Sequence, residues 1–226
     1  MSDACTSFLA QGFTVASAVI DGATLASISS HLDTSPAVGA GRRGLLREGW
    51  CESLAAKLRS ILSAQQLLPE GVVAIQCTLF DKRPTKNWLV ALHQDRSIPV
   101  RDRVAATELS GWSEKEGEIF VQPPVAVLEQ LTAVRLHIDD CSAVNGALRV
   151  VPGSHANGVL SQREAEAFRV RYGEILVPAC KADALLMKPL ILHASSKATS
   201  GARRRVLHFV YGPKVLPFGL CWQHAI

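Results

Sequence analysis

The stretch from Leu89 to Arg96 constrains this chain most, because it places an imidazole and a carboxylate on one face of a strand. Its sequence is Leu-Val-Ala-Leu-His-Gln-Asp-Arg. In an extended strand alternate side chains share a face, so His93 and Asp95 lie side by side while Gln94 points the other way. The apolar residues before His93 have the length and composition of a buried strand. The polar pair at its end is therefore either a satisfied core pair or a site.

A histidine nitrogen and a carboxylate oxygen on one face are two ligands of the 2-His-1-carboxylate triad, which binds non-haem Fe(II) and leaves positions open on the metal. The second histidine must come from elsewhere in the fold. The best candidate is His193, which ends the apolar run that begins at Leu190. Arg204 follows His193 by eleven residues, within the strand-like segment 203–210. The sequence thus contains a candidate metal triad and an arginine at a fixed spacing from it.

These residues resemble the pattern of the phytanoyl-CoA dioxygenase family of iron(II)/2-oxoglutarate oxygenases. The family has His-Gln-Asp, then a distant histidine, then an arginine eleven residues later. Segment 145–155, Asn-Gly-Ala-Leu-Arg-Val-Val-Pro-Gly-Ser-His, is similar to a further family stretch that lies between them. The resemblance runs from about Val72 to Trp222. A His-x-Asp pair alone is weak evidence, whereas these elements together and in order are specific.

The resemblance implies an Fe(II) centre held by His93, Asp95 and His193. In the family, 2-oxoglutarate chelates the iron through its 2-oxo acid end and O2 takes the last position. The implied reaction oxidises 2-oxoglutarate to succinate and CO2 and, by default, hydroxylates a small-molecule substrate. Related halogenases lack the carboxylate ligand because halide takes its place, so Asp95 argues against halogenation.

The resemblance also implies co-substrate contacts. Arg204 would bind the far carboxylate of 2-oxoglutarate, which suits a guanidinium because it offers two parallel donors. Arg203 and Arg205 point to the other face of the strand and are expected at the surface. Ser195 and Gln76 match positions that contact the co-substrate in some relatives. Each is equally explained as a buried polar group bonded to the backbone.

Other polar residues have weaker claims on the site. His155 of the Pro-Gly-Ser-His segment is the main rival as a metal ligand, although in the family this histidine is generally not one. His208 shares a face with the candidate arginine and is expected to support the site or to pack. Arg135 and His137 lie on the polar face of the predicted strand 131–139. They would touch substrate if that face looks inward, and solvent if it does not.

Periodicity predicts a β-rich chain with helices outside, including an amphipathic helix over 48–68. The resemblance supplies the topology: mainly β with flanking helices, in a double-stranded β-helix (a cupin-like jelly roll). We expect a single domain over 1–226, with an N-terminal helical segment at 1–70 and the jelly-roll core at 71–226. Nothing in the sequence suggests a linker that would divide it.

Local signals predict several connections. Asn145-Gly146 is a tight-turn signal, expected to join the strand 131–139 to the strand 147–151 as a hairpin. Thr34–Gly44 and Ile98–Glu118 are expected to be irregular loops that shape the pocket, and the second is long enough to act as a lid. Ser161, with a glutamate three residues later, is expected to cap a short helix.

Composition excludes several other classes. The chain has 226 residues, a net charge of +4 and a sequence pI of about 8.8, which is not the strong basic footprint of a nucleic-acid binder but suits an anionic small molecule. Its six cysteines form no C-x-x-C pair and, without a signal-peptide pattern, are expected to be reduced thiols in the cytoplasm. No apolar run approaches the roughly 20 residues of a membrane span. The sequence leaves the oligomeric state open.

Two other interpretations use the same residues. A relative that kept the fold could bind a ligand without turnover, although every motif residue is intact. A cupin-like metal hydrolase could use the three ligands to hold zinc and activate water, but Arg204 would then have no evident partner. The substrate itself is not named by any motif.

Overall fold

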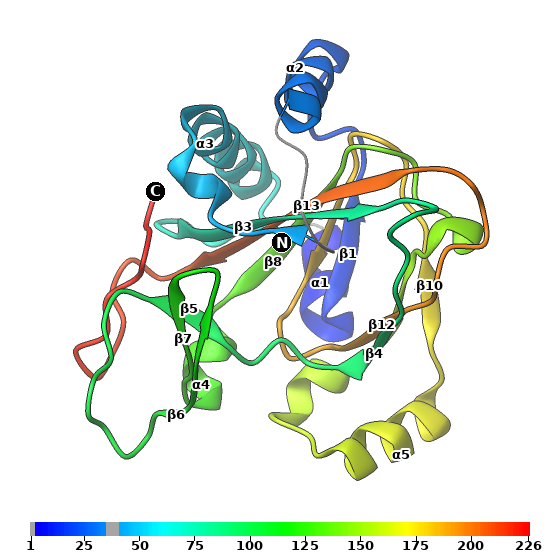
Figure 1. The fold of residues 1–226 in the computed structure, drawn as a ribbon. Coiled ribbons are helices and arrows are strands. Elements are labelled where there is room, and N and C mark those ends of the chain that lie inside the picture. Colours follow the sequence, from blue (N-terminus) through cyan, green and yellow to red (C-terminus); the bar gives the residue numbers. More distant parts are fainter. Residues whose placement is uncertain (1–2, 35–40) are drawn as a thin grey trace.

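Strands from distant parts of the chain form two antiparallel sheets that pack face to face (Figure 1), in a computed structural model that describes residues 3–34 and 41–226. The large sheet has the spatial order β1 (Phe13–Ala16), β11 (Ala184–Met187), β8 (Thr132–His137), β13 (Arg204–Gly212), β3 (Val73–Lys82) and β2 (Gly41–Arg42). The small sheet has the order β10 (Ile175–Val177), β9 (Leu148–Val151), β12 (Leu192–Ser195) and β4 (Val90–His93). This arrangement is the predicted jelly roll, mainly β with few helices.

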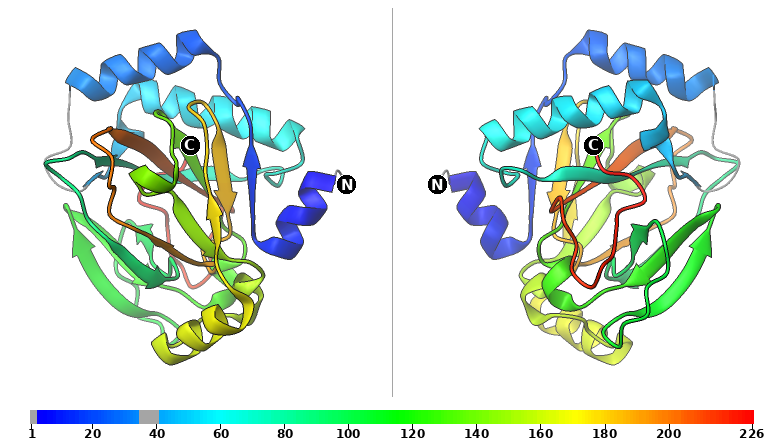
Figure 2. Two further views of the ribbon diagram at one scale, coloured as in Figure 1. Left: turned by 90° about the vertical axis from the view of Figure 1, so that its right-hand side faces the viewer. Right: turned by 90° about the vertical axis from the view of Figure 1, so that its left-hand side faces the viewer.

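A third sheet and several helices surround these layers. The third sheet has the order β5 (Ile98–Val100), β7 (Glu118–Gln122) and β6 (Ser110–Lys115). The helices are α1 (Asp3–Gln11), α2 (Gly22–Thr34), α3 (Gly49–Ala64), α4 (Val125–Leu128) and α5 (Gln162–Tyr172). Short 3-10 turns are η1 (Leu45–Arg47), η2 (Ala143–Asn145) and η3 (Ser154–Asn157). Figure 2 shows α2 and α3 on one side of the sandwich and α5 on the opposite side.

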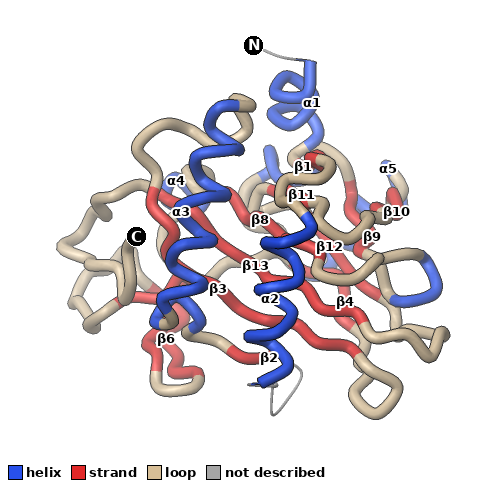
Figure 3. The backbone as a smooth tube through the Cα atoms, turned by 90° about the horizontal axis from the view of Figure 1, so that it is seen from above, coloured by secondary structure: helices blue, strands red, loops and turns tan. Residues whose placement is uncertain are grey.

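Helices α2 and α3 lie across the outer face of the large sheet (Figure 3). The predicted helical spacing of α3 places Leu54, Leu58 and Leu62 on one buried stripe, which packs on that face. From β13, Phe209 and Tyr211 point into the same layer, and the Tyr211 hydroxyl donates a hydrogen bond to a carbonyl of α3. Arg204 and His208, which lie on the opposite face of β13, therefore point into the interior of the jelly roll.

On the small sheet too, alternate side chains of one strand face the outer helix or the interior. Leu192 and Ala194 of β12 form a buried cluster with Ala165 of α5, on the outer face of this sheet. His193 and Ser195 consequently point inward, toward the large sheet. Because side chains alternate between the two faces of this strand, the polar residues His193 and Ser195 both reach the interior.

The predicted start of α5 is confirmed, and α2 begins with a similar side-chain cap. The Ser161 side chain accepts a hydrogen bond from the backbone N–H of Glu164, and the Glu164 carboxylate accepts one from the backbone N–H of Ser161, which is the predicted capping box of α5. Asp21 accepts a hydrogen bond from the backbone N–H of Thr24 at the start of α2. The segment 1–70 is less purely helical than predicted, because β1 pairs with β11 at one edge of the large sheet and β2 with β3 at the other.

The predicted hairpin at Asn145-Gly146 is wrong. The strands on either side, β8 and β9, belong to different sheets, and Asn145 instead ends η2. Gly146 has a positive φ of 82°, and a Cβ there would lie 2.8 Å from the carbonyl oxygen of Ser196 and 3.0 Å from Nζ of Lys82. A glycine is required here because the chain crosses between sheets in close contact with both residues, and its local turn signal is the same as that of a hairpin.

The predicted irregular loop at Ile98–Glu118 is also wrong in part. It contains β5 and β6, which pair with β7 on either side. The strand residues Ser110–Lys115 are mostly polar and exposed, so they lack the apolar alternation that signals a half-buried strand. Of the other predicted loop, Thr34–Gly44, residues 35–40 lie outside the described residues, and Gly41 begins β2.

The six cysteines carry free thiols. No helix among the described residues combines the length and apolar character needed to cross a bilayer. The C-terminal segment is held to the sheets: Trp222 is buried in a cluster with Val100 and Leu131, and the Ala74 and Ile226 backbones exchange hydrogen bonds.

An ion-pair cluster ties α2 to the large sheet. Arg203 donates to Asp81 through Nε and Nη2, both at 3.0 Å, and to Asp33 of α2 at 2.7 Å. Arg205 donates to both carboxylate oxygens of Asp139. The two arginines face away from Arg204 as predicted, but Arg205 is buried rather than at the surface.

Asp81→Asn is expected to lower the free energy of unfolding by about 1–3 kcal/mol at neutral pH, because it removes the charged acceptor of a buried pair. Burial alone would raise the pKa of Asp81, but hydrogen bonds from Arg203 and Arg83 outweigh it and lower this pKa. A carboxyl with a lowered pKa stabilises the fold above its ordinary pKa, and this contribution is lost as the pH falls through the lowered value. Urea unfolding of both proteins should therefore show a difference that shrinks in acid.

The control is Asp102→Asn, which removes the exposed partner of Arg101. Its expected cost is only about 0–1 kcal/mol. Equal losses from the two substitutions, or a loss from Asp81→Asn that does not depend on pH, would contradict the role given to this cluster.

Candidate metal centre and cavity

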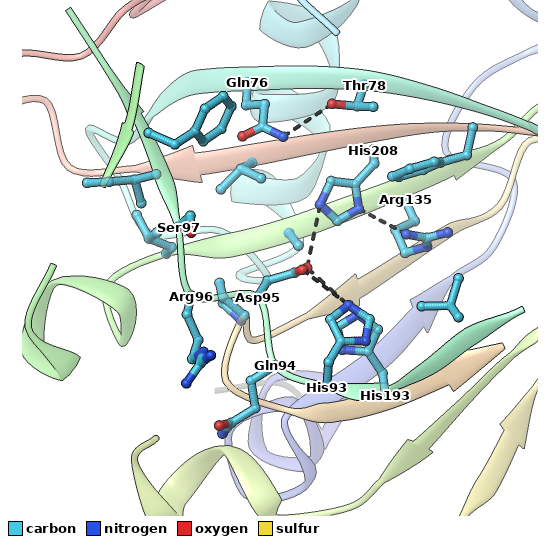
Figure 4. Close-up of a pocket in the computed structure, with 18 of the residues that line it drawn as sticks. Gln76, Thr78, His93, Gln94, Asp95, Arg96, Ser97, Arg135, His193 and His208 are labelled. Atoms are coloured by element: carbon cyan, nitrogen blue, oxygen red, sulfur yellow. Dashed lines mark hydrogen bonds and ion pairs between the residues drawn. The ribbon is translucent and has the colours of Figure 1, made fainter. Parts of the chain in front are cut away.

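The pairing of β4 with β12 brings two histidines together. His193 is the direct register partner of His93, and their ring centroids are 4.2 Å apart. Asp95 follows β4, where its backbone N–H donates to the carbonyl of Pro189. Its carboxylate lies 3.6 Å from Nε2 of His93 and 3.8 Å from Nε2 of His193 (Figure 4). These three residues offer ligand atoms within 4.8 Å of one another and could hold a metal ion.

Backbone carbonyls set the tautomer of both histidines. Nδ1 of His93 lies 2.8 Å from the carbonyl oxygen of Ala91, and Nδ1 of His193 lies 3.0 Å from that of Ile191. A carbonyl only accepts, so each Nδ1 carries the proton and each Nε2 keeps a free lone pair directed at Asp95. Such outer hydrogen bonds orient metal-binding histidines. The donor set of two imidazole nitrogens and one carboxylate therefore fits Fe(II).

The charges of the triad suit a cation. Burial would raise the pKa of Asp95, but the nearby His193, His93 and His208 outweigh it, so this pKa lies well below its usual range. Burial lowers the pKa of His193 to about 4, against the opposing effect of Asp95. Burial also acts to lower the pKa of His93, but Asp95 outweighs it and raises this pKa. Near neutral pH Asp95 is an anion and His193 a neutral ligand.

His208 and Arg135 face the triad from the large sheet. They are register partners on β13 and β8, and Nη1 of Arg135 donates to Nδ1 of His208 at 3.1 Å. The guanidinium cannot accept, so the His208 proton is on Nε2, which lies 4.0 Å from the Asp95 carboxylate. Burial lowers the pKa of His208 to about 3 and that of Arg135 to about 10. At neutral pH His208 is therefore neutral and Arg135 charged.

A cavity of about 490 Å³ opens in front of the triad. On the side of the large sheet its wall includes Gln76 and Thr78, whose side chains are hydrogen bonded to each other (Figure 4). Gln94 points away from the triad and bonds to the carbonyls of Gly158 and Leu190, as its predicted orientation requires. The cavity is large enough for a small organic ligand.

One end of the cavity is cationic. Arg204 is 2% exposed, donates to the carbonyl of Gly146 at 2.7 Å, and has an Nε without a hydrogen-bond partner. Its register partner Lys82 donates to the Ser195 hydroxyl at 3.1 Å and to the carbonyl of Ser196. Burial and, to a smaller extent, repulsion by Arg204 lower the pKa of Lys82 to about 8. Arg204, Lys82 and Ser195 thus gather N–H and O–H donors that suit an anion. Ser195 is two residues beyond the candidate ligand His193.

Of the remaining predicted site residues, some line the cavity and others lie outside it. Gln76 lines the cavity but lies six residues along β3 from Lys82, about 20 Å at 3.3 Å per residue. A contact of Gln76 with the co-substrate stays a prediction. Gln76 is too far along the strand to reach a co-substrate carboxylate that is bound at Arg204. His137 is buried behind the wall and both of its ring nitrogens lack partners. His155 lies apart from the triad, against α1, with Nε2 3.2 Å from the carbonyl of Leu9.

Sequence reasoning missed Lys82, and it underestimated Arg135 and His208. The signal for Lys82 was present, because alternation from Gln76 places Lys82 on the same face of β3. The polar residues 81–83 before Pro84 have the composition of a turn, but β3 continues to Lys82. The pairing of Arg135 with His208 depends on the register of β8 and β13, which no local pattern specifies.

The fold and the convergent donor set define a jelly-roll protein with a candidate 2-His-1-carboxylate centre. The family described as Phytanoyl-CoA dioxygenase (PhyH) matches residues 42–206. The chain belongs to this family, as its motifs predicted. A comparison with curated proteins found no match.

Solved structures agree on the fold. HygX from Streptomyces hygroscopicus, with nickel and 2-oxoglutarate bound, is 18% identical with a TM-score of 0.68, over 96% of this chain and 89% of that one. The epimerase SnoN, in complex with Fe3+, alpha ketoglutarate and nogalamycin RO, is 14% identical with a TM-score of 0.70, over 96% and 86%. AviO1 from Streptomyces viridochromogenes Tue57 is 21% identical with a TM-score of 0.63, over 95% of both chains.

His193→Ala is expected to weaken Ni(II) binding by more than about 100-fold, because loss of a ligand should exceed the roughly 10–100-fold effect of outer hydrogen-bond partners. Isothermal titration of the purified protein with nickel chloride measures this affinity. His155→Ala is the matched control, since it removes a histidine that lies apart from the triad. Weakening by His155→Ala equal to that by His193→Ala would contradict the assignment.

Proposed function

We propose that the protein is an Fe(II)/2-oxoglutarate-dependent dioxygenase that hydroxylates a small-molecule substrate. One observation carries the proposal most directly: the free Nε2 atoms of His93 and His193 converge with the Asp95 carboxylate in the wall of a cavity whose end is closed by Arg204. A metal triad alone would suit many reactions. Here the triad shares a cavity with a buried arginine that forms no ion pair with a carboxylate among the described residues. This combination suits a co-substrate with two acid groups.

Each residue has a defined task in this proposal. His93, Asp95 and His193 would hold the iron, with the imidazole rings kept in place by their Nδ1–H bonds to backbone carbonyls. Arg204 would take the far carboxylate of 2-oxoglutarate through its free Nε and remaining N–H groups. Ser195, held by Lys82, would donate a second hydrogen bond to that carboxylate.

When bound, iron and 2-oxoglutarate would supply the oxidation, with one atom of O2 ending in succinate, the other in the hydroxylated substrate, and CO2 released. The residues of the cavity wall would limit which part of a substrate can reach the triad. The wall opposite the cationic end is apolar, including Ile75, Leu128 and Leu131. This region would exclude water and hold the substrate beside the triad.

The neighbouring structures support the class of enzyme more strongly than the outcome of the reaction. HygX has been solved with nickel, 2-oxoglutarate and hygromycin B, and SnoN with nogalamycin RO, so both bind small molecules in addition to the co-substrate. SnoN is described as an epimerase and the similar SnoK as a carbocyclase. Hydroxylation is our choice because it needs no residue beyond those already placed.

Purified protein supplied with Fe(II), 2-oxoglutarate and air is expected to consume O2 and form succinate, and Asp95→Ala is expected to stop both. Oxygen-electrode traces and succinate quantification provide the measurement. Metal-dependent 2-oxoglutarate binding without succinate under any substrate would favour a binding protein instead. Hydrolysis that requires metal but not 2-oxoglutarate would favour the hydrolase.

Arg204→Gln is expected to raise the dissociation constant of 2-oxoglutarate by about 10–100-fold, because a hydrogen bond between charged groups contributes about 1.5–3 kcal/mol. Titration of 2-oxoglutarate into the Ni(II)-loaded protein measures it. Arg203→Gln is the matched control, since its side chain lies on the other face of the same strand. Unchanged affinity in Arg204→Gln with intact metal binding would contradict the assignment.

A further inference from the structure

We propose that Arg135 binds an acid group of the substrate, so that the protein acts on small carboxylic acids with an apolar body. The inference rests on the proposed function and deepens it, because it names a substrate class for the same cavity. Nothing in the family pattern assigns Arg135 a role.

Arg135 is a buried cation without an anionic partner. Its side chain lines the cavity and the residue is only 7% exposed. Nη1 donates to the neutral His208, Nε has no hydrogen-bond partner, and the guanidinium lies 5.4 Å from the centre of the Phe80 ring. It forms no ion pair with any described carboxylate. A buried guanidinium in this state is costly until an anion joins it.

The cavity as a whole has an excess of positive charge. Lys82, Arg135 and Arg204 are all buried in or beside it, and Asp95 is the only acidic residue among the described residues that line it. Fe(II) and the doubly charged 2-oxoglutarate cancel each other, so loading the centre leaves this excess in place. A substrate with a carboxylate would reduce it, whereas a neutral substrate would leave a buried charge unpaired.

The position of Arg135 fits the substrate better than the far end of the co-substrate. The register places the backbone of Arg135 opposite His208, four residues along β13 from Arg204, which is a backbone spacing of about 13 Å at 3.3 Å per residue. Beyond Arg135 on β8, Ala133 and Leu131 continue into the apolar part of the cavity. An acid group at Arg135 would therefore be separated from the triad by the His208 ring, and the apolar body of the molecule would lie along Ala133 and Leu131.

The test compares matched acids and amides on protein saturated with Ni(II) and 2-oxoglutarate. The probes are hexanoate with hexanamide and 3-phenylpropanoate with 3-phenylpropanamide, titrated by calorimetry. Each acid is expected to bind about tenfold or more tighter than its amide, as expected for a hydrogen-bonded ion pair. This comparison in the unaltered protein needs no variant to fold. Acids that bind no better than amides, including no detectable binding of either, would overturn the inference.

Variants then assign the preference to Arg135. Arg135→Met is expected to remove the preference for acids while changing the Ni(II) and 2-oxoglutarate affinities by less than about threefold. Arg135→Lys, which keeps the charge, should retain part of it. Arg171→Met, which removes an exposed arginine of α5, is the matched control and should retain all of it.

The outcomes separate this inference from the proposed function. If Arg135→Met weakens 2-oxoglutarate as strongly as Arg204→Gln does, Arg135 belongs to the co-substrate site and the inference fails while the proposed function stands. If the unaltered protein binds no 2-oxoglutarate in the presence of Ni(II), the proposed function fails and the inference fails with it. A preference for acids that persists in Arg135→Met also contradicts the inference.

Discussion

The antiparallel pairing of β4 with β12 is the interaction on which the candidate centre depends. It sets His93 directly opposite His193, although a hundred residues separate them in the chain. The backbone of the same two segments then fixes both rings, because the carbonyls of Ala91 and Ile191 hold the Nδ1 protons and leave each Nε2 free. A shift of one residue in this register would turn one histidine outward and remove the centre.

The large sheet completes the site with charges that are costly in isolation. Its inner face presents Lys82, Arg135 and Arg204, all buried and none in an ion pair with a described carboxylate. Elsewhere the chain pairs its buried charges, as Arg205 with Asp139 shows. Unpaired cations gathered around one cavity therefore indicate that anions enter it, and the co-substrate and an acidic substrate would supply them.

The sequence alone predicted those features of the fold and the site that depend on one local segment of the chain. Alternation placed His93 and Asp95 on one face, and capping chemistry predicted the start of α5. His193 was a candidate because it ends an apolar run, but only the family resemblance linked it to His93, since no local pattern does so. The contact of Arg135 with His208 depends on the pairing of distant strands and could not be predicted. Asn145-Gly146 misled because a chain crossing between sheets needs the same positive φ as a hairpin.

The most direct test of this account is a crystal structure of the protein with Ni(II) and 2-oxoglutarate, with the metal located by anomalous scattering. The account predicts one metal peak, bonded to Nε2 of His93, Nε2 of His193 and an oxygen of Asp95, with the far carboxylate of 2-oxoglutarate on Arg204. A metal bound elsewhere, or a co-substrate whose far carboxylate does not reach Arg204, would contradict it.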